Sequence, residues 1–354
     1  MKFLQLFKDS NDYDQFEFND TKIMKVPSEN LCVYCQKDTS KFIDVQFQIP
    51  VCSEECDKAI WIEYKNEMNN DFIRNHMSRY AKEMREELIC VESVNDVMKD
   101  IVIVVHNQID YLKITIESLL EYTNNFHLWI WDNNSDQETK VYLQELMFKL
   151  NDDPTRGCTV MSSDVNMGFI EPNNELASLG SGDYIILLNS DVKVFGGWDK
   201  AMLGWLQQNQ DTKLVGYAGG LLDVQGVGGR VAFGYDIDYI AGWCLCLERK
   251  TYEKYGLFNS DLKFAYAEDS EMSVRIQNFG HRIYALHLLL VHHYENKTIN
   301  QVRKEGVIDV VSTFAHNHEK FRQLWPDYLN NQRVDVRARV KGEEALDEIL
   351  GKLE

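Results

Sequence analysis

The chain has 354 residues, enough for one large hydrophobic core or two modest ones, and its content of 44% hydrophobic and 26% charged residues is ordinary for a globular protein. A formal net charge of −19 argues against broad electrostatic contact with nucleic acid or an anionic membrane, because both need a positive protein surface. No apolar run approaches the roughly 18 residues of a membrane span, and the apolar part of Met1–Lys8 is too short for a signal peptide. We therefore expect a cytoplasmic protein without a transmembrane segment.

Two close pairs of cysteines lie near the N-terminus, Cys32 with Cys35 and Cys52 with Cys56. Pairs at this separation are typical of tetrahedral zinc held by four thiolates, and four thiolates leave no open position for a substrate. We therefore predict a structural zinc site; the alternative is four free cysteines. The second pair resembles the closing half of small treble-clef zinc fingers, in which the first turn of a helix carries the last two ligands.

The next segment, from residue 57 to about 92, has an apolar stripe at helical spacing and predicts charged helix. From residue 100 onward, short apolar runs alternate with amphipathic segments. The runs predict buried strands over 101–105, 127–131, 158–161 and 184–188, and the segments between them predict helices over 111–122, up to about 150, and 172–180. This alternation predicts an α/β fold with a mainly parallel sheet.

The apolar run that begins after Asp183 stops abruptly at Asn189-Ser190-Asp191. Ligands of open α/β sheets bind beyond the carboxyl ends of the strands, and an acid placed there can hold a divalent cation and, through it, phosphate oxygens. The alternative is that Asp191 merely starts a turn. The sequence argues against a dinucleotide-binding fold, because the first strand is followed by His106-Asn107 without the glycines that admit a pyrophosphate.

Two later segments have local signals of structure. Residues Gly216–Gly234 are rich in glycine and predict either a mobile loop or a β-hairpin. The segment His316–Trp325 predicts a helix that ends before Pro326.

Several motifs, taken in order, resemble those of family 2 glycosyltransferases of the GT-A class, and most closely its rhamnosyltransferase-like members. The resemblance covers about residues 98–300 and is carried by Ile101–Asn107, Trp131–Asp136, Asn166–Phe169, Tyr184–Val192, Gly242–Lys250, Ala267–Arg275 and Val291–Tyr294. It implies a Rossmann-like GT-A domain that binds a nucleoside-diphosphate sugar and acts as a hexosyl- or pentosyltransferase.

The resemblance also implies roles for single residues on the donor side. Asp132, Asn166, Asn189 and Asp191 would contact the donor nucleotide. Asp191 and His293 would hold a divalent cation, Mn or Mg, which would neutralise the departing diphosphate. His292 is the alternative ligand, because neighbours on a strand point to opposite faces. Many relatives carry an Asp where this chain has Asn189, which brings no charge to the metal.

On the acceptor side, the resemblance implies that Asp269 is the base in a single displacement that inverts the anomeric carbon, with Trp243 and Glu268 beside it. The alternative is that Glu268 and Asp269 only cap a helix, where the helix dipole favours a carboxylate.

The sequence thus predicts three parts: a zinc-finger and helical segment (1–92), a glycosyltransferase domain (93–300) and a C-terminal helical extension (301–354). We expect the acceptor to be a saccharide or another small cellular molecule. The alternative is a macromolecule, protein or nucleic acid with modified bases, with the zinc finger as a docking module. A binding or scaffold protein that has lost activity is disfavoured by the retention of Asp132, Asp191, Asp269 and a late histidine.

Overall fold

The computed structural model describes residues 23–25, 42–44, 50–51, 82–92, 94, 97–222, 226–288, 290–294, 301–302, 305–306 and 308–329. Contacts divide the chain into two units, Met1–Ile89 with His287–Leu289, and Cys90–Leu286 with Leu290–Glu354. The four cysteines predicted to bind zinc lie outside the described residues. None of the helices among the described residues is long and apolar enough to cross a membrane.

In the first unit, three short strands form an antiparallel sheet in the order β1 (Ile23–Lys25), β2 (Phe42–Asp44) and β3 (Pro50–Val51). The helix over residues 82–92, of which 82–89 belong to this unit, is the last part of the segment predicted to be helical; the rest of that segment, with its apolar stripe, lies outside the described residues. Within this unit the buried carboxylate of Glu87 accepts hydrogen bonds from the backbone N–H groups of His287 and Leu288.

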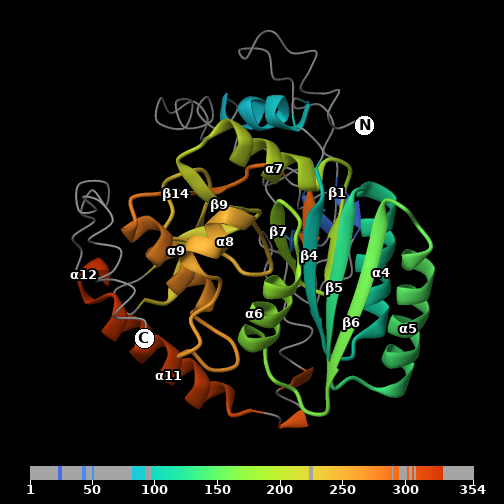
Figure 1. Ribbon diagram of the computed structural model, residues 1–354. Coiled ribbons are helices and arrows are strands. Elements are labelled where there is room, and N and C mark those ends of the chain that lie inside the picture. The colour runs from blue at the N-terminus through green and yellow to red at the C-terminus, as the bar shows by residue number, and fades with distance from the viewer. Residues whose placement is uncertain are drawn as a thin grey trace. The chain divides into compact units, whose positions relative to one another are not determined.

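The second unit is built on a seven-stranded sheet in the order β14-β9-β13-β7-β4-β5-β6, in which β13 alone runs antiparallel to its neighbours (Figure 1). Its strands are β4 (Lys99–Val105), β5 (Phe126–Asn133), β6 (Arg156–Ser163), β7 (Tyr184–Leu188), β9 (Thr212–Gly216), β13 (Cys244–Glu248) and β14 (Arg282–Ala285). The prediction of an α/β fold with a mainly parallel sheet is confirmed, and every residue of β7 is buried.

The helices follow the predicted alternation for the first half of this unit. They are α4 (Ile109–Tyr122), α5 (Gln137–Asn151), α6 (Ile170–Leu179), α7 (Trp198–Gln208), α8 (Arg249–Tyr255), α9 (Glu268–Asn278), α11 (Val310–Leu324) and α12 (Pro326–Leu329). Asp136 caps α5 by accepting a hydrogen bond from Thr139 N, and Asp309 caps α11 in the same way through Ser312 N. The predicted helix stop at Pro326 is confirmed for α11.

Smaller sheets lie beside the main one. The hairpin alternative for the glycine-rich segment is confirmed, because β10 (Gly219–Leu222) pairs antiparallel with β11 (Gly228–Ala232) and β12 (Tyr239–Ile240). A separate two-stranded sheet joins β8 (Val192–Val194), directly after the end of β7, to β15 (Val291–His293).

Side chains of the sheet alternate between two packed faces. On one face Val102, Ile185 and Leu187 pack in a single cluster with Leu176 of α6 and Met272 of α9. The cysteines Cys90, Cys158, Cys244 and Cys246 are free and buried. Figure 1 shows α4 and α5 on one side of the strands and α6 on the other, the arrangement expected of a sheet covered on both faces.

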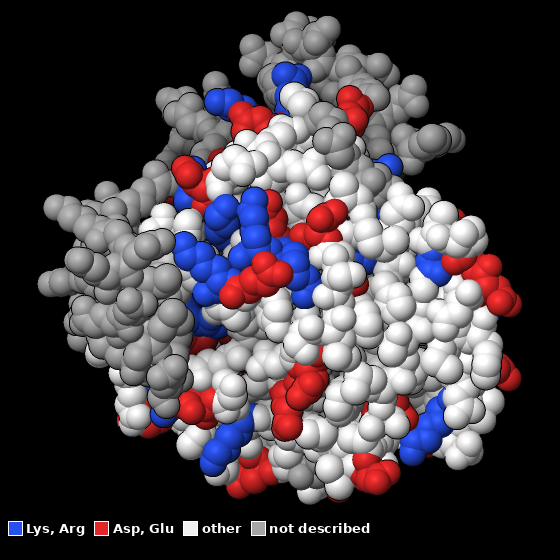
Figure 2. Space-filling view, in the orientation of Figure 1, with Lys and Arg blue, Asp and Glu red and all other residues white. Residues whose placement is uncertain are grey.

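Positive side chains gather on one part of the surface despite the net negative charge of the chain. Figure 2 shows Lys and Arg side chains over α8, where Lys213 and Lys250 flank Glu248. Glu248 pairs with Tyr184 at the start of β7. This basic patch therefore lies at the end of the sheet where β7 begins, and Asp191 lies at the other end.

A buried ion pair ties β4 to α7. Lys99 Nζ lies 2.9 Å from Asp199 Oδ2, and the two side chains are 0% and 2% exposed. Asp199→Ala removes the carboxylate from a buried ammonium, so we expect a loss of about 3–5 kcal/mol in the free energy of unfolding, measured by urea denaturation. Glu319→Ala is the control, because it breaks an exposed pair with Arg322 on α11 and should leave the unfolding midpoint nearly unchanged. Equal effects of the two variants would contradict this account.

Candidate functional site

Asp191 is fixed directly beyond the buried end of β7. The hydroxyl of Thr115, on α4, lies 2.9 Å from Ser190 O and 2.8 Å from Val192 O, and it accepts a hydrogen bond from Val192 N. Because a hydroxyl has one proton, these two carbonyls and that of Tyr111, 3.2 Å away, share it. Thr115 therefore holds the backbone on both sides of Asp191, and the carboxylate itself is 2% exposed.

The strand β15 brings a histidine to this carboxylate. His293 Nε2 lies 3.2 Å from Asp191 Oδ1 and 3.4 Å from Asn189 Nδ2. The indole of Trp243 stacks on the imidazole, with ring centroids 4.9 Å apart and planes inclined by 15°. The stacked indole and the pairing of β15 with β8 fix the imidazole next to the carboxylate.

Asp191 and His293 fit a divalent cation. A carboxylate oxygen and an imidazole nitrogen that face each other at this distance share either a proton or a metal ion, and both are established ligands of divalent metals. No cluster of three or more His, Cys, Asp or Glu side chains able to hold a metal occurs in the part of the chain that the structure describes. A cation here would have few protein ligands, which is typical of ions that also coordinate substrate phosphates.

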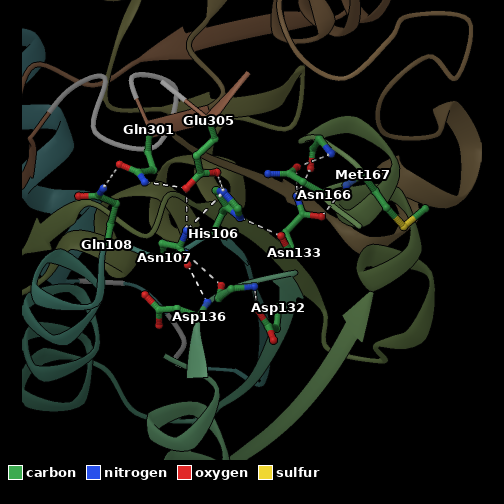
Figure 3. Close-up of polar contacts among 12 residues, drawn as sticks. His106, Asn107, Gln108, Asp132, Asn133, Asp136, Asn166, Met167, Gln301 and Glu305 are labelled. Atoms are coloured by element: carbon green, nitrogen blue, oxygen red, sulfur yellow. Dashed lines mark hydrogen bonds and ion pairs between the residues drawn. The ribbon is translucent and has the colours of Figure 1, made fainter. Parts of the chain in front are cut away.

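A pocket of about 460 Å³ opens beyond the ends of β4, β5 and β6. It is lined by mostly polar side chains that follow the three strand ends, together with one residue from the C-terminal part of the chain: His106, Asn107, Asn134, Ser135, Asp136, Val165, Asn166 and Glu305. Figure 3 shows the side chains of His106, Asn107 and Glu305 pointing toward one another across this region.

The imidazole of His106 contacts both the backbone carbonyl of Asn133 and the carboxylate of Glu305. His106 Nδ1 is 2.9 Å from the carbonyl of Asn133, which can only accept, so this nitrogen carries a hydrogen. His106 Nε2 is 2.7 Å from a carboxylate oxygen of Glu305, within hydrogen-bond distance. Burial raises the pKa of Glu305, but hydrogen bonds from His106, Gln301 and Asn107 outweigh burial and hold that pKa below its ordinary value. The lowered pKa keeps Glu305 a carboxylate beside the imidazole.

Asn133 fixes the wall of the pocket that β6 contributes. Its Nδ2 donates to Asn166 Oδ1 and to the carbonyl of Gly168, both at 2.8 Å, and its Oδ1 accepts from Met167 N at 2.7 Å. Asp132 accepts a hydrogen bond from Ser135 N and is 2% exposed. The carboxylate of Asp132 thus lies beside the pocket rather than on its wall, and its contact with a nucleobase stays a prediction.

The two acidic residues at the start of α9 differ in accessibility. Asp269 is partly exposed; its Oδ2 accepts from Gly242 N at 3.1 Å and its Oδ1 from Ser270 N at 2.7 Å. Glu268 is buried, and its Oε2 has no hydrogen-bond partner among the described residues. Burial and the neighbouring charge of Asp269 raise the pKa of Glu268 to about 8. Burial also raises the pKa of Asp269, against the hydrogen bonds that lower it.

The structure connects most of the residues that the sequence singled out. Asn189, Asp191, His293 and Trp243 lie together, and Gly242 links them to Asp269, because its N–H binds the Asp269 carboxylate while the adjacent Trp243 carbonyl accepts from Asn189 N. Of the two neighbouring histidines, His293 contacts Asp191, whereas the ring of His292 lies against Tyr294. Burial and the neighbouring His293 lower the pKa of His292 to about 4.

Thr115, Asn133 and Glu305 are site residues that the sequence did not reveal. A local signal existed for Asn133, which directly follows Asp132 at the end of an apolar run. The partners of Thr115 and Glu305 lie 75 and 199 residues away along the sequence, and no local sequence pattern predicts such contacts.

Residues 100–219, from β4 to the start of β10, match the model of the family described as Glycosyl transferase family 2. A comparison with proteins of curated function found no match.

The fold is similar to that of GalNAc-T7, solved with UDP, GalNAc and Mn2+, with a TM-score of 0.57 and 16% identity over 75% of this chain and 60% of that chain. This chain therefore spans 60% of the length of GalNAc-T7. A second similar structure is the mannosyltransferase PcManGT from Pyrobaculum calidifontis in complex with GDP-Man and Mn2+, with a TM-score of 0.47 and 10% identity over 78% of this chain and 95% of that chain. The prediction of a GT-A-like fold is confirmed.

The raised pKa of Glu268 makes the stability of the protein depend on pH. Its pKa rises from the ordinary 4.5 to about 8 in the folded state, so the folded protein keeps a proton that the unfolded chain releases between these values. The free energy of unfolding therefore falls as pH rises from about 4.5 to about 8. Glu268→Gln keeps the shape of the neutral form, and we expect it to melt above the wild type at pH 8, by roughly 2–4 °C for each kcal/mol regained, but not at pH 5.

Calorimetry or scanning fluorimetry at both pH values measures this difference. Glu253→Gln, at an exposed position of α8, serves as the control and should melt with the wild type at both. A melting temperature of Glu268→Gln that differs from the wild type by the same amount at pH 5 and pH 8 would refute the assignment of a buried, neutral carboxyl.

Proposed function

We propose that this protein transfers a sugar from a nucleoside-diphosphate sugar to an acceptor hydroxyl with inversion of the anomeric carbon. The observation that carries the proposal is the contact of Asp191 with His293 beyond the buried strand β7. It is supported by the match of residues 100–219 to a glycosyltransferase family and by the similarity of the fold to GalNAc-T7. The finer assignment as a rhamnosyltransferase-like hexosyl- or pentosyltransferase rests on the motif resemblance alone.

The donor would lie across the ends of the strands. The pocket at β4, β5 and β6 has room for the nucleoside, with Asn166 on its wall and Asp132 beside it. Asn189, which follows β7, has a side-chain amide that would hydrogen-bond a ribose hydroxyl or a phosphate oxygen of the donor. A divalent cation, Mn or Mg, held by Asp191 and His293 would supply charge neutralisation for the departing diphosphate.

Asp269 would act as the base. In the transfer, the acceptor oxygen forms a bond to the anomeric carbon, the bond from that carbon to the diphosphate oxygen breaks, and the acceptor proton passes to Asp269. The raised pKa of Asp269 favours proton acceptance, and Gly242 N and Ser270 N orient the carboxylate. Glu268 and Trp243 would lie on the acceptor side, where the neutral carboxyl of Glu268 adds no second negative charge.

The charge distribution favours a small acceptor such as a saccharide. The basic patch over α8 lies at the opposite end of the sheet from Asp191 and Asp269, so no positive patch surrounds the proposed base. Acceptor screening decides this point: transfer to oligosaccharides or small alcohols supports the assignment, whereas transfer confined to protein or to modified DNA bases supports the macromolecular alternative. The charged, convergent residues of the site disfavour an inactive scaffold.

A donor screen tests the proposal. Hydrolysis of UDP-, dTDP- and GDP-sugars with Mn or Mg should identify one donor, and Asp191→Asn should lower the rate by about 10²–10³-fold, because charge stabilisation of the leaving group is lost. The same variant should abolish the rise in melting temperature that nucleotide and metal together produce in the wild type. Glu145→Gln, on the exposed face of α5, is the control and should retain both. A wild type that neither hydrolyses nor binds any nucleotide sugar would refute the function.

We also infer, from cysteine spacing alone, that Cys32, Cys35, Cys52 and Cys56 hold a structural zinc ion. Elemental analysis of the purified protein should find one zinc ion per chain, in addition to any metal at the donor site. The double change Cys52→Ser and Cys56→Ser should remove this zinc, whereas Cys158→Ser, which alters a buried free thiol, should keep it. A protein without zinc, or a double variant that retains it, would contradict the inference.

A further inference from the structure

The loop of residues 263–267, directly before the Glu268–Asp269 pair, has an unusual backbone. Phe264, Tyr266 and Ala267 have φ angles of 59°, 82° and 65°. These values lie in the left-handed region, which residues with a side chain rarely adopt. Such a conformation persists where surrounding contacts determine it.

The side chain of Asn317, on α11, supplies most of these contacts. Its Nδ2 lies 2.8 Å from Lys263 O, 2.8 Å from Ala265 O and 3.0 Å from Tyr266 O. Its Oδ1 accepts a hydrogen bond from Lys263 N at 2.9 Å. The amide NH2 group has two hydrogens, so two of the three carbonyls share one.

The orientation of this amide is determined by its surroundings. The opposite orientation would place the amide oxygen against three carbonyl oxygens and the NH2 group against Lys263 N–H. Asn317 is also fully buried, with an exposed fraction of 0%, so water does not replace these hydrogen bonds.

The remaining carbonyls of the loop bind the donor side of the site and the helix that carries Asp269. Phe264 O accepts hydrogen bonds from Phe169 N at 2.6 Å and Ile170 N at 3.2 Å, at the start of α6. Ala267 O accepts from Glu271 N at 2.8 Å in the first turn of α9. Every carbonyl of the loop therefore has a named partner, and Asn317 supplies the partner for three of them.

The position of α11 does not depend on Asn317. Phe321 and Trp325 pack against Ala267 and Val274 of the α9 region, and the Trp325 indole donates to Glu271. A change at Asn317 therefore removes the hydrogen bonds to the loop while the apolar contacts that attach α11 remain.

We infer that Asn317 is a positioning residue for the transfer reaction: it fixes the backbone of the 263–267 loop so that Asp269 stands at a defined place relative to the donor. The inference rests on the proposed function, because it takes Asp269 as the base. Asn317 itself touches neither the proposed cation ligands nor the pocket wall, so it acts through the loop.

Two variants test this role. Asn317→Ala removes all four hydrogen bonds, and we expect kcat to fall by about 10–100-fold, the range that follows from a displacement of about 1 Å, with the donor KM nearly unchanged. Asn317→Asp has the same shape and keeps the acceptor for Lys263 N, but it sets an oxygen against three carbonyls. We expect Asn317→Asp to lower kcat at least as much as Asn317→Ala. A role in packing alone predicts instead that the isosteric Asp is tolerated.

Asn151 provides a matched control. Its side chain also binds a backbone in both directions, with Nδ2 donating to Cys158 O at 3.1 Å and Oδ1 accepting from Cys158 N at 2.9 Å, at the edge of the sheet away from Asp191. Asn151→Ala should therefore lower the melting temperature without changing kcat.

Hydrogen–deuterium exchange of the full chain gives a readout that needs no turnover. Amides of residues 262–271 should exchange faster in Asn317→Ala than in the wild type, and at the same rate in Asn151→Ala. An active wild type whose Asn317 variants both keep kcat, or unchanged exchange in this segment, overturns the inference. A wild type that turns over no nucleotide sugar overturns the proposed function, and the catalytic part of this inference with it, even where exchange shows that Asn317 holds the loop.

Discussion

The complete burial of β7 is the constraint on which the site depends. Each of its five residues is buried, with helices on both faces of the sheet. No side chain of the strand can therefore contact solvent or a ligand before the strand ends. The polar residues of Asn189-Ser190-Asp191 then appear together, and the Thr115 hydroxyl satisfies the backbone that the end of the strand leaves unpaired. A strand with one solvated face would have allowed acids anywhere along its length. Here burial restricts the carboxylate to one place, next to β15 and His293.

Three segments of the site have left-handed residues that are not glycine. Two of them are held from the C-terminal part of the chain, and the third contains Asn134. Asn107 and Gln108, at the end of β4, are contacted by Glu305 and Gln301, and the 263–267 loop is contacted by Asn317. Each such residue costs on the order of 1–3 kcal/mol. A hydrogen bond stabilises the fold by about 1 kcal/mol, so several hydrogen bonds are needed to offset the strain of each segment. The helical extension is thus part of the site and not an appendage to the domain.

Much of the fold was predictable because β4, β5 and β7 are continuous apolar runs of strand length, and the helices between them have one polar face. The helix α7 was not predicted. It begins after Gly197 without a side-chain cap, so its sequence lacks the usual start signal of a helix. Asp191 was predictable from its place at a strand end. Thr115, Glu305 and Asn317 were not, because each acts on residues 50 or more positions away, and a threonine or asparagine inside a helix has no local pattern that distinguishes it.

The contact between His106 and Glu305 has a consequence for the order in which the site forms during synthesis. Chains fold as they emerge, from the N-terminus onward. When residue 294 has been made, all seven strands of the main sheet, Asp191, His293 and Asp269 are present, but one wall of the pocket and the support of the 263–267 loop are not. The ribosome supplies Glu305 and Asn317 last among the residues of the site. A growing chain therefore contains Asp191, His293 and Asp269 before it can complete the pocket and the loop around them, and the complete candidate site belongs to the chain that has folded past α11.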